Sequence, residues 1–228
     1  TMAAGKVFYA KVYSANSLAA FKTGKYALVL NMGTGVDPAV TKTNTTLANG
    51  TTLSSGGGYA ETKNFESTVN MLTLGVQQTS DRAVATAING DFVTTWASNT
   101  GSGWDVFAQR FNRDGVKQGT EFLVSQTTAG DQADPVVAMD VLGNFLVSWS
   151  SAGQDGSGSG VYARRFSSHG VAFGDEFRVN TTTTNDQSAP SLAMDAIGDA
   201  IITWTSSGQD GSGSGVYGQR YSFLGIAS

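Results

Sequence analysis

Cysteine is absent from this chain of 228 residues, and histidine occurs once. The lack of cysteine excludes disulfides, thiol catalysis and zinc sites with thiolate ligands. A single histidine excludes any site that needs two, such as the HExxH zinc motif. Only 14% of the residues are charged, against about 25% in a typical globular domain. Ser, Thr, Asn, Gln and Gly must therefore supply most of the polar surface.

Long hydrophobic runs are also missing. No stretch approaches the roughly 20 apolar residues that span a bilayer, so we expect no membrane insertion. A net charge of −4 and a pI of about 4.9 argue against nucleic acid as a partner. The hydrophobic content of 40% is nevertheless typical of a chain with a folded core rather than of a disordered one.

The sequence does contain an internal repeat of about 55 residues. VVAMDVLGNFLVSWSSAGQDGSGSGVYARRF (136–166) lines up with SLAMDAIGDAIITWTSSGQDGSGSGVYGQRY (191–221) at a constant offset of 55. A less similar copy contains NGDFVTTW (89–96) and VFAQRF (106–111). SLAAFKTGKYALVL (17–30) is a strongly diverged copy of the start of the last repeat. Four repeats therefore fit the chain.

We expect one domain over residues 1–228. It would contain a diverged repeat (24–89) with an insertion at 36–58, repeats at 90–142 and 143–197, and a last repeat at 198–228 that residues 1–23 complete. The insertion is rich in Thr, Ser, Asn and Gly, which predicts either a flexible surface segment or an arm that contacts a neighbouring subunit.

Each repeat contains four short segments with strand character, separated by Gly, Asn, Asp and Ser clusters. One segment type is apolar on both faces, as in FLVSW (145–149), so a strand there must be covered on both sides. Stacked four-stranded sheets meet this demand, which predicts an all-β fold, most simply a small closed β-propeller whose N-terminal strands complete the last blade. An open stack of sheets, or a half-ring that dimerises, is the alternative.

Several polar residues recur with the repeat. Arginine recurs in the segments VFAQRF, VYARRF and VYGQRY, and glutamate recurs in FESTVN, EFLVS and EFRVN. A buried guanidinium needs a carboxylate or carbonyl partner. We therefore predict that both residue types make contacts within the fold rather than bind a ligand. The recurring residues are Arg110, Arg165 and Arg220, and Glu66, Glu121 and Glu176.

The pattern GDFVVxW…GQDGSGxGVYxQRF…GxEFxVN resembles a repeat of very large bacterial surface and secreted proteins, which are described as hemolysin-type calcium-binding or adhesin-like. The resemblance covers roughly residues 64–228 and is strongest over 119–221. It implies an extracellular or cell-surface setting and a role in binding. The calcium-binding nonapeptides of those proteins (GGxGxDxUx) are absent here, so the resemblance does not imply calcium binding.

The two GQDGSGSG loops are weak candidates for calcium. Each offers a single carboxylate, Asp155 or Asp210, whereas calcium takes six to eight oxygens, usually with several carboxylates. The simpler interpretation is a glycine-rich hairpin whose aspartate bonds to its own turn. No cofactor is otherwise expected.

One tryptophan departs from the repeat. Trp96, Trp149 and Trp204 keep strand phase and are predicted to lie in the core, whereas Trp104 stands in a connection where the other copies carry Gly and Ser. An exposed tryptophan is a good stacking platform for a sugar ring, and Asp105 beside it could accept a hydroxyl hydrogen bond. The alternative is that Trp104 fills space left by a hairpin two residues shorter.

The favoured function is therefore a non-enzymatic extracellular recognition or adhesion module whose partner is a glycan or surface polymer. The chain lacks a GxSxG motif, and nothing singles out a pair of catalytic carboxylates, so we expect no enzyme activity. The alternative is a structural building block of a filament, layer or virion, in which neighbouring copies of the chain make contact through the insertion.

Overall fold

The computed structural model describes residues 45–46, 52–53, 67–99 and 101–227. The chain divides into two units, 1–66 and 67–228, which are described separately. In the first unit, β1 (Thr45–Thr46) pairs antiparallel with β2 (Thr52–Leu53), within the predicted insertion. The other elements predicted before Ser67 lie outside the described residues.

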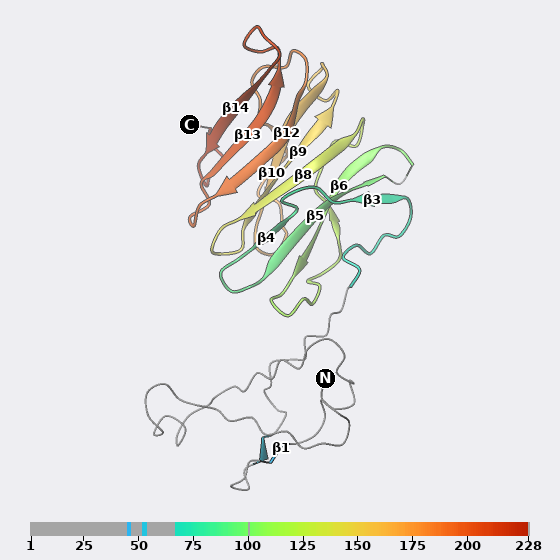
Figure 1. Cartoon of the computed structure of the whole chain (residues 1–228), viewed down its shortest axis with the longest axis vertical. Coiled ribbons are helices and arrows are strands. Elements are labelled where there is room, and N and C mark those ends of the chain that lie inside the picture. Colours follow the sequence, from blue (N-terminus) through green and yellow to red (C-terminus); the bar gives the residue numbers. More distant parts are fainter. Residues whose placement is uncertain (1–44, 47–51, 54–66, 100, 228) are drawn as a thin grey trace, which may run out of the picture. The chain divides into compact units, whose positions relative to one another are not determined.

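The second unit consists of three antiparallel sheets, as the repeats predict (Figure 1). The first sheet holds β3 (Val76–Gln78), β4 (Val84–Thr86), β5 (Phe92–Asn99), β6 (Trp104–Phe111) and β7 (Phe122–Leu123). The second holds β8 (Gln132–Met139), β9 (Phe145–Ala152), β10 (Ser159–Phe166) and β11 (Phe177–Arg178). The third holds β12 (Gln187–Met194), β13 (Ala200–Ser207) and β14 (Ser214–Tyr221). The described residues contain no helix, so the all-β prediction is confirmed.

Neighbouring strands are consecutive in the chain, except that β3 and β4 of the first sheet both pair with β5. The same irregularity of register recurs in the second and third sheets. In β8 the register against β9 shifts between Ala133 and Val136, and in β12 it shifts between Ser188 and Ser191. Asp134 and Ala189 lie inside these shifts, and each has a φ of 53°. Such a bulge re-aims the following residues and increases the local twist. Its recurrence shows that the repeat fixes the backbone path as well as the strands.

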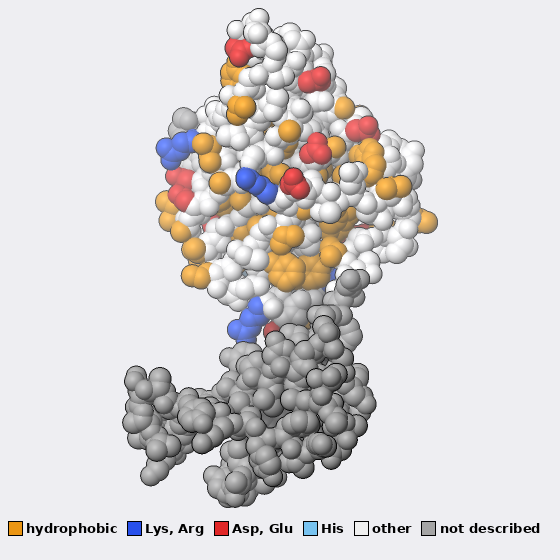
Figure 2. Space-filling model, in the orientation of Figure 1, with side chains coloured by type: hydrophobic (Ala, Val, Ile, Leu, Met, Phe, Trp, Pro, Cys, Tyr) orange, Lys and Arg blue, Asp and Glu red, His pale blue; other side chains and the backbone are white. Residues whose placement is uncertain are grey.

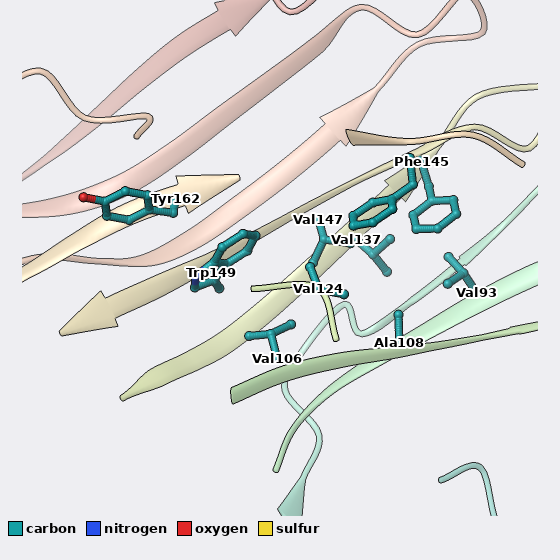
Figure 3. Close-up of a cluster of buried hydrophobic side chains, with 10 residues drawn as sticks. Val93, Val106, Ala108, Val124, Val137, Phe145, Val147, Trp149 and Tyr162 are labelled. Carbon is teal, nitrogen blue, oxygen red and sulfur yellow. The ribbon is translucent and has the colours of Figure 1, made fainter. Parts of the chain in front are cut away.

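Buried apolar side chains hold the first and second sheets face to face. Val93, Val106 and Ala108 of the first sheet and Val147 and Trp149 of the second all belong to one buried cluster (Figure 3). A second cluster joins the second sheet to the third in the same way. Since β9 is thereby covered on both faces, its run of apolar residues on both sides is explained.

The repeated tryptophans lie in these cores, as predicted. Trp149 is completely buried, and Trp96 and Trp204 are 5% and 6% exposed. On the face of the second unit that Figure 2 shows, acidic and basic side chains are few and scattered, and several hydrophobic side chains are exposed. Within the described part of the chain no helix is long and apolar enough to cross a membrane.

Closure of the sheets into a ring stays a prediction. The third sheet has three strands, and the segment predicted to complete it, residues 1–23, lies outside the described residues. The single-domain organisation predicted for 1–228 is likewise not decided by the described residues.

Candidate functional site

A hollow of about 520 Å³ lies where the first and second sheets meet at one rim. One wall is the end of β3, at Gln78, and residues 79–81 of the connection to β4. The other is Asp131 and the bulged start of β8 that follows it, where Asp134 and Pro135 lie. Trp104, the first residue of β6, completes the lining together with Ala97. The structure therefore places the one tryptophan that departs from the repeat in this hollow.

The β5–β6 hairpin beside this hollow is two residues shorter than the corresponding hairpin of the next sheet. β5 ends in Asn99, which pairs with Trp104, whereas β9 ends in Ala152, which pairs with Ser159 after a loop two residues longer. That longer loop reaches the next sheet, where the Ser157 hydroxyl accepts a hydrogen bond from the Asn185 N–H at 3.2 Å. At the first junction the hollow lies beside the shorter hairpin.

Trp104 is held by its backbone. Its N–H donates to Oδ1 of Asp131 at 3.1 Å, and in the next repeat the Ser159 N–H donates to Asp186 in the same way at 2.8 Å. The backbone hydrogen bond thus recurs in both repeats, whereas the indole side chain occurs only at Trp104 and is replaced by serine at Ser159. The side chain is half-buried and lines the hollow, so one part of its surface is available to a ligand.

Asp105 does not join Trp104 in the hollow. Successive side chains of a strand point to opposite faces, so Asp105 lies on the other side of β6, beside Ser98, with which it pairs. One of its carboxylate oxygens is buried without a hydrogen-bond partner. Burial raises the pKa of this carboxyl above its ordinary value. The predicted pair of Trp104 and Asp105 is therefore not brought together.

The polar groups around Trp104 come from residues that the sequence analysis did not select. Asp81, Asp131 and Asp134 are exposed carboxylates of the lining, and Thr79 and Ser80 add hydroxyls. Lys, Arg and His are not among the lining residues. The Ser80 hydroxyl also donates to the carbonyl of Pro135, which links the two walls. These residues fall on both sides of the junction, so no contiguous motif could reveal them.

The GQDGSGSG loops form turns. Asp155 accepts from the Ser157 N–H at 3.2 Å, and Asp210 accepts from the Ser212 N–H at 3.1 Å, as expected for an aspartate that bonds to its own turn. Asp155 also accepts from the Asn180 side chain. Within the described ranges no group of three or more acidic, His or Cys side chains is placed to hold a metal ion.

The recurring arginines and glutamates join neighbouring sheets, although they do not pair with each other. Arg165 donates to the carbonyls of Gly198 at 2.8 Å and Ser222 at 3.3 Å. The Glu176 carboxylate accepts from the backbone N–H groups of Gln126 and Thr127 at 2.6 and 3.1 Å. The predicted internal role is thus seen for two of the arginines and two of the glutamates, Arg110, Arg165, Glu121 and Glu176, with carbonyls and amides as the partners. Arg220 is exposed, and Glu66 lies outside the described residues.

A smaller hollow of about 290 Å³ lies between the same two sheets and is lined by Arg110, His169 and Asp91. Arg110 donates to the carbonyl of His169. Burial lowers the pKa of this guanidinium, and the nearby Asp91 carboxylate acts in the opposite direction. At the next junction Phe223 stands where Ser168 stands here, with its ring centroid 6.0 Å from the Arg165 guanidinium.

Comparisons with known proteins identify no family for this chain and one distantly similar solved structure. No protein-family model matches the chain, and neither does a curated protein. Among solved structures, the chain is similar to an endo-arabinase from Bacteroides thetaiotaomicron, at 15% identity and a TM-score of 0.40, over 59% of this chain. The match spans about half of the length of that protein, 53%. A likeness at this level assigns no fold detail, substrate or catalytic residue to this chain.

The prediction that the chain is not an enzyme is contradicted by the same finding. The protein with the matching structure is an enzyme, and the absence of a catalytic motif from one sequence does not exclude catalysis by residues that only the fold brings together. The exclusion is therefore withdrawn. The resemblance to bacterial surface repeats stays a prediction, since no family model matches.

Proposed function

We propose that residues 67–228 recognise a carbohydrate, and that the hollow beside Trp104 is the binding site. The observation that carries this proposal is the coincidence of a half-exposed indole and carboxylates in one hollow. A sugar ring has an apolar face that stacks on an aromatic ring, and hydroxyls around its edge that donate to acceptors. Trp104 would supply the platform, and Asp131 and Asp134 the acceptors.

The charge of the lining selects among glycans. Three carboxylates with no cation among the lining residues repel uronic acids and sulfated sugars. Neutral sugars with several hydroxyls satisfy the carboxylates without this repulsion. We therefore expect neutral polysaccharides or oligosaccharides to bind, and acidic ones such as pectin or alginate to bind far more weakly.

The setting we propose follows from the resemblance to surface repeats, which implies an extracellular or cell-surface protein that contacts a glycan or surface polymer. The low charge and the Gly- and Ser-rich connections suit such a role. Adhesion is one use of such a site, and processing of the bound polymer is another.

The test is a glycan array with the full chain, followed by calorimetric titration of the best neutral ligand. The variant is Trp104→Ser, because serine stands at the same position of the next repeat, as Ser159. We expect at least about a tenfold loss of affinity, or about 1.4 kcal/mol. The matched control is Phe173→Ser, a change of an aromatic residue that is 55% exposed and outside the hollow.

Two outcomes would contradict the proposal. One is an array on which no neutral glycan binds. The other is a ligand whose affinity falls equally in both variants, because the loss would then not depend on the hollow. Parallel titrations with calcium and with EDTA separate a metal-dependent site at Asp155 or Asp210 from the site proposed here.

A further inference from the structure

The smaller hollow, of about 290 Å³, is lined by a guanidinium and a carboxylate that do not pair with each other. The guanidinium is that of Arg110, and the carboxylate is that of Asp91. Among the described residues an ion pair forms between Arg113 and Asp114, at 4.0 Å, and not between these two groups. Burial lowers the pKa of Arg110 and the Asp91 carboxylate acts in the opposite direction, so the two charges lie close enough to interact. The hollow therefore offers both charges to a ligand.

Arg110 makes one contact within the fold and has further hydrogen-bonding capacity. Its Nη1 donates to the carbonyl of His169, which also lines the hollow. Its Nε and Nη2 have no hydrogen-bond acceptor among the described residues. At the next junction Arg165 donates from both Nη1 and Nη2, to the carbonyls of Gly198 and Ser222. The Nε and Nη2 groups of a guanidinium form an edge that can bind a carboxylate through two parallel hydrogen bonds.

The second junction has carboxylates that the first one lacks. Burial lowers the pKa of Arg165, and the carboxylates of Asp140 and Asp199 act in the opposite direction. The residues at the same repeat positions of the first junction are Ala87 and Asn144, which carry no charge. A carboxylate that a ligand brings to the first junction would supply the anion that the repeat places there at the second.

The aromatic ring beside Arg165 is also missing from the first junction. At the second junction the ring centroid of Phe223 lies 6.0 Å from the Arg165 guanidinium. A Cβ placed on Gly198 would lie 2.8 Å from that ring. A Cβ placed on the equivalent Gly143 would lie 3.1 Å from the Cβ of Ser168. Serine thus occupies the place of the phenylalanine, and it lines the hollow.

The carboxylate of Asp91 has acceptor positions left for a cationic group. It accepts from the Asn89 side chain at 2.8 Å and from the Arg113 N–H at 3.0 Å. A carboxylate has about four acceptor positions, so about two remain. Much of the remaining lining is apolar, namely the side chains of Phe92, Phe111, Met139, Leu142 and Phe145. The hollow thus combines two opposite charges with an apolar wall.

We propose that this hollow binds a free α-amino acid with an apolar side chain. The carboxylate of the ligand pairs with Arg110, its ammonium group pairs with Asp91, and its side chain lies against the apolar wall. A ligand with only one of these charges would be repelled by the group of like charge. The volume of about 290 Å³ suits so small a ligand, since it is at the lower end of the range of about 300–1,000 Å³ for small-molecule pockets. This site shares no lining residue with the hollow beside Trp104 and does not depend on carbohydrate binding.

The first test is calorimetric titration of the full chain with L-leucine and with two analogues. Leucinamide keeps the ammonium group and lacks the carboxylate, whereas 4-methylpentanoate keeps the carboxylate and lacks the ammonium group. We expect saturable binding of leucine, and at least about tenfold weaker binding of each analogue, because each leaves one charge of the hollow without a partner.

The second test changes the lining of the hollow. Ser168→Phe introduces the side chain that the next junction has at this position, so we expect it to fill the hollow and weaken leucine binding at least about tenfold. The Tm should stay within about 3 °C. Arg110→Gln should weaken leucine binding by a similar factor. Its matched control is Arg113→Gln, which should leave the affinity unchanged, because the Arg113 side chain is 74% exposed and lies outside the lining.

The proposal is overturned if leucine shows no saturable binding at concentrations up to about 10 mM. Leucine binding that Ser168→Phe leaves unchanged also overturns it, because the ligand would then lie outside the hollow. Equal affinities for leucine and 4-methylpentanoate overturn the assignment of the ammonium group to Asp91. Trp104→Ser should leave leucine binding unchanged, so this test and the test of the carbohydrate site fail independently.

Discussion

The two junctions between sheets share one framework and differ in what lies at their rims. Each has a buried cluster, an aspartate that accepts from the first backbone N–H of β6 or β10, and an arginine that donates to the next sheet's carbonyls. At the second junction the longer hairpin reaches the next sheet, and Phe223 packs on Arg165. At the first, a shorter hairpin and Ser168 accompany two hollows. The framework is repeated, while the candidate site is a local departure from it.

The largest expected effect is the loss of stability when a core tryptophan is removed, compared with the loss when Trp104 of the candidate site is removed. Trp149→Ala should lower the free energy of unfolding by about 3–5 kcal/mol, because a completely buried indole is removed. Trp104→Ser should lower it by less than about 1 kcal/mol, since this side chain is half-exposed. Urea unfolding measures both. Equal losses in the two variants would show that Trp104 is part of the core.

The glutamates of the two sheets should differ in the same measurement. Glu176 accepts four hydrogen bonds, from two backbone amides, the Thr127 hydroxyl and the Gln154 side chain. Glu121 accepts two, from the amides of Met71 and Leu72. Glu176→Ala should therefore cost about 2–3 kcal/mol and Glu121→Ala about half as much. The reverse order would show that the two carboxylates do not play equivalent parts.

An exchange of hairpins tests the origin of the hollow. Replacing residues 99–104 with the sequence AGQDGSGS (152–159) should fill the rim and abolish glycan binding. We expect the free energy of unfolding to stay within about 1 kcal/mol, because the framework hydrogen bond of Asp131 is made by a backbone N–H that the new hairpin also has. Binding that survives the exchange would place the ligand elsewhere.

The smallest effect concerns the carboxyl of Asp105. Burial raises its pKa in the folded state above 3.8, its ordinary value. The folded protein therefore holds the proton more tightly than the unfolded chain, and its stability falls as the pH rises from below 3.8 through the raised pKa. Asp105→Asn should raise the Tm by about 1–2 °C at pH 7 and leave it unchanged at about pH 3. A pH-independent change would mean that the charge is not the cause.

The strands and the core of the second unit could be predicted from the sequence because they recur in each repeat. The shared 55-residue offset locates the strands, the core tryptophans and the recurring polar residues, and all of these are found where both copies are described. The repeat could not show which groups the glutamates and arginines bind. Recurrence indicates that a residue has a structural role, but it does not identify the residue's hydrogen-bond partners. The amides of Gln126 and Thr127 carry no side-chain signal at all.

The candidate site was predictable only in part. Trp104 could be found because it breaks the repeat, and the shorter hairpin was visible too. Asp131 and Asp134 were not, since they come from the next sheet and look like ordinary turn residues until the fold places them beside Trp104. The selection of Asp105 as a partner failed because adjacent residues of a strand point to opposite faces.

The most direct test of the carbohydrate site is an NMR titration of the full chain with the best neutral ligand from the array. The indole N–H of Trp104 is assigned by its disappearance in Trp104→Ser. The account predicts that this signal and the amides of residues 78–81 and 131–135 shift together, while the buried indoles of Trp149 and Trp204 stay in place. Saturable binding with no shift at Trp104, and with changes confined to the GQDGSGSG loops, would contradict it.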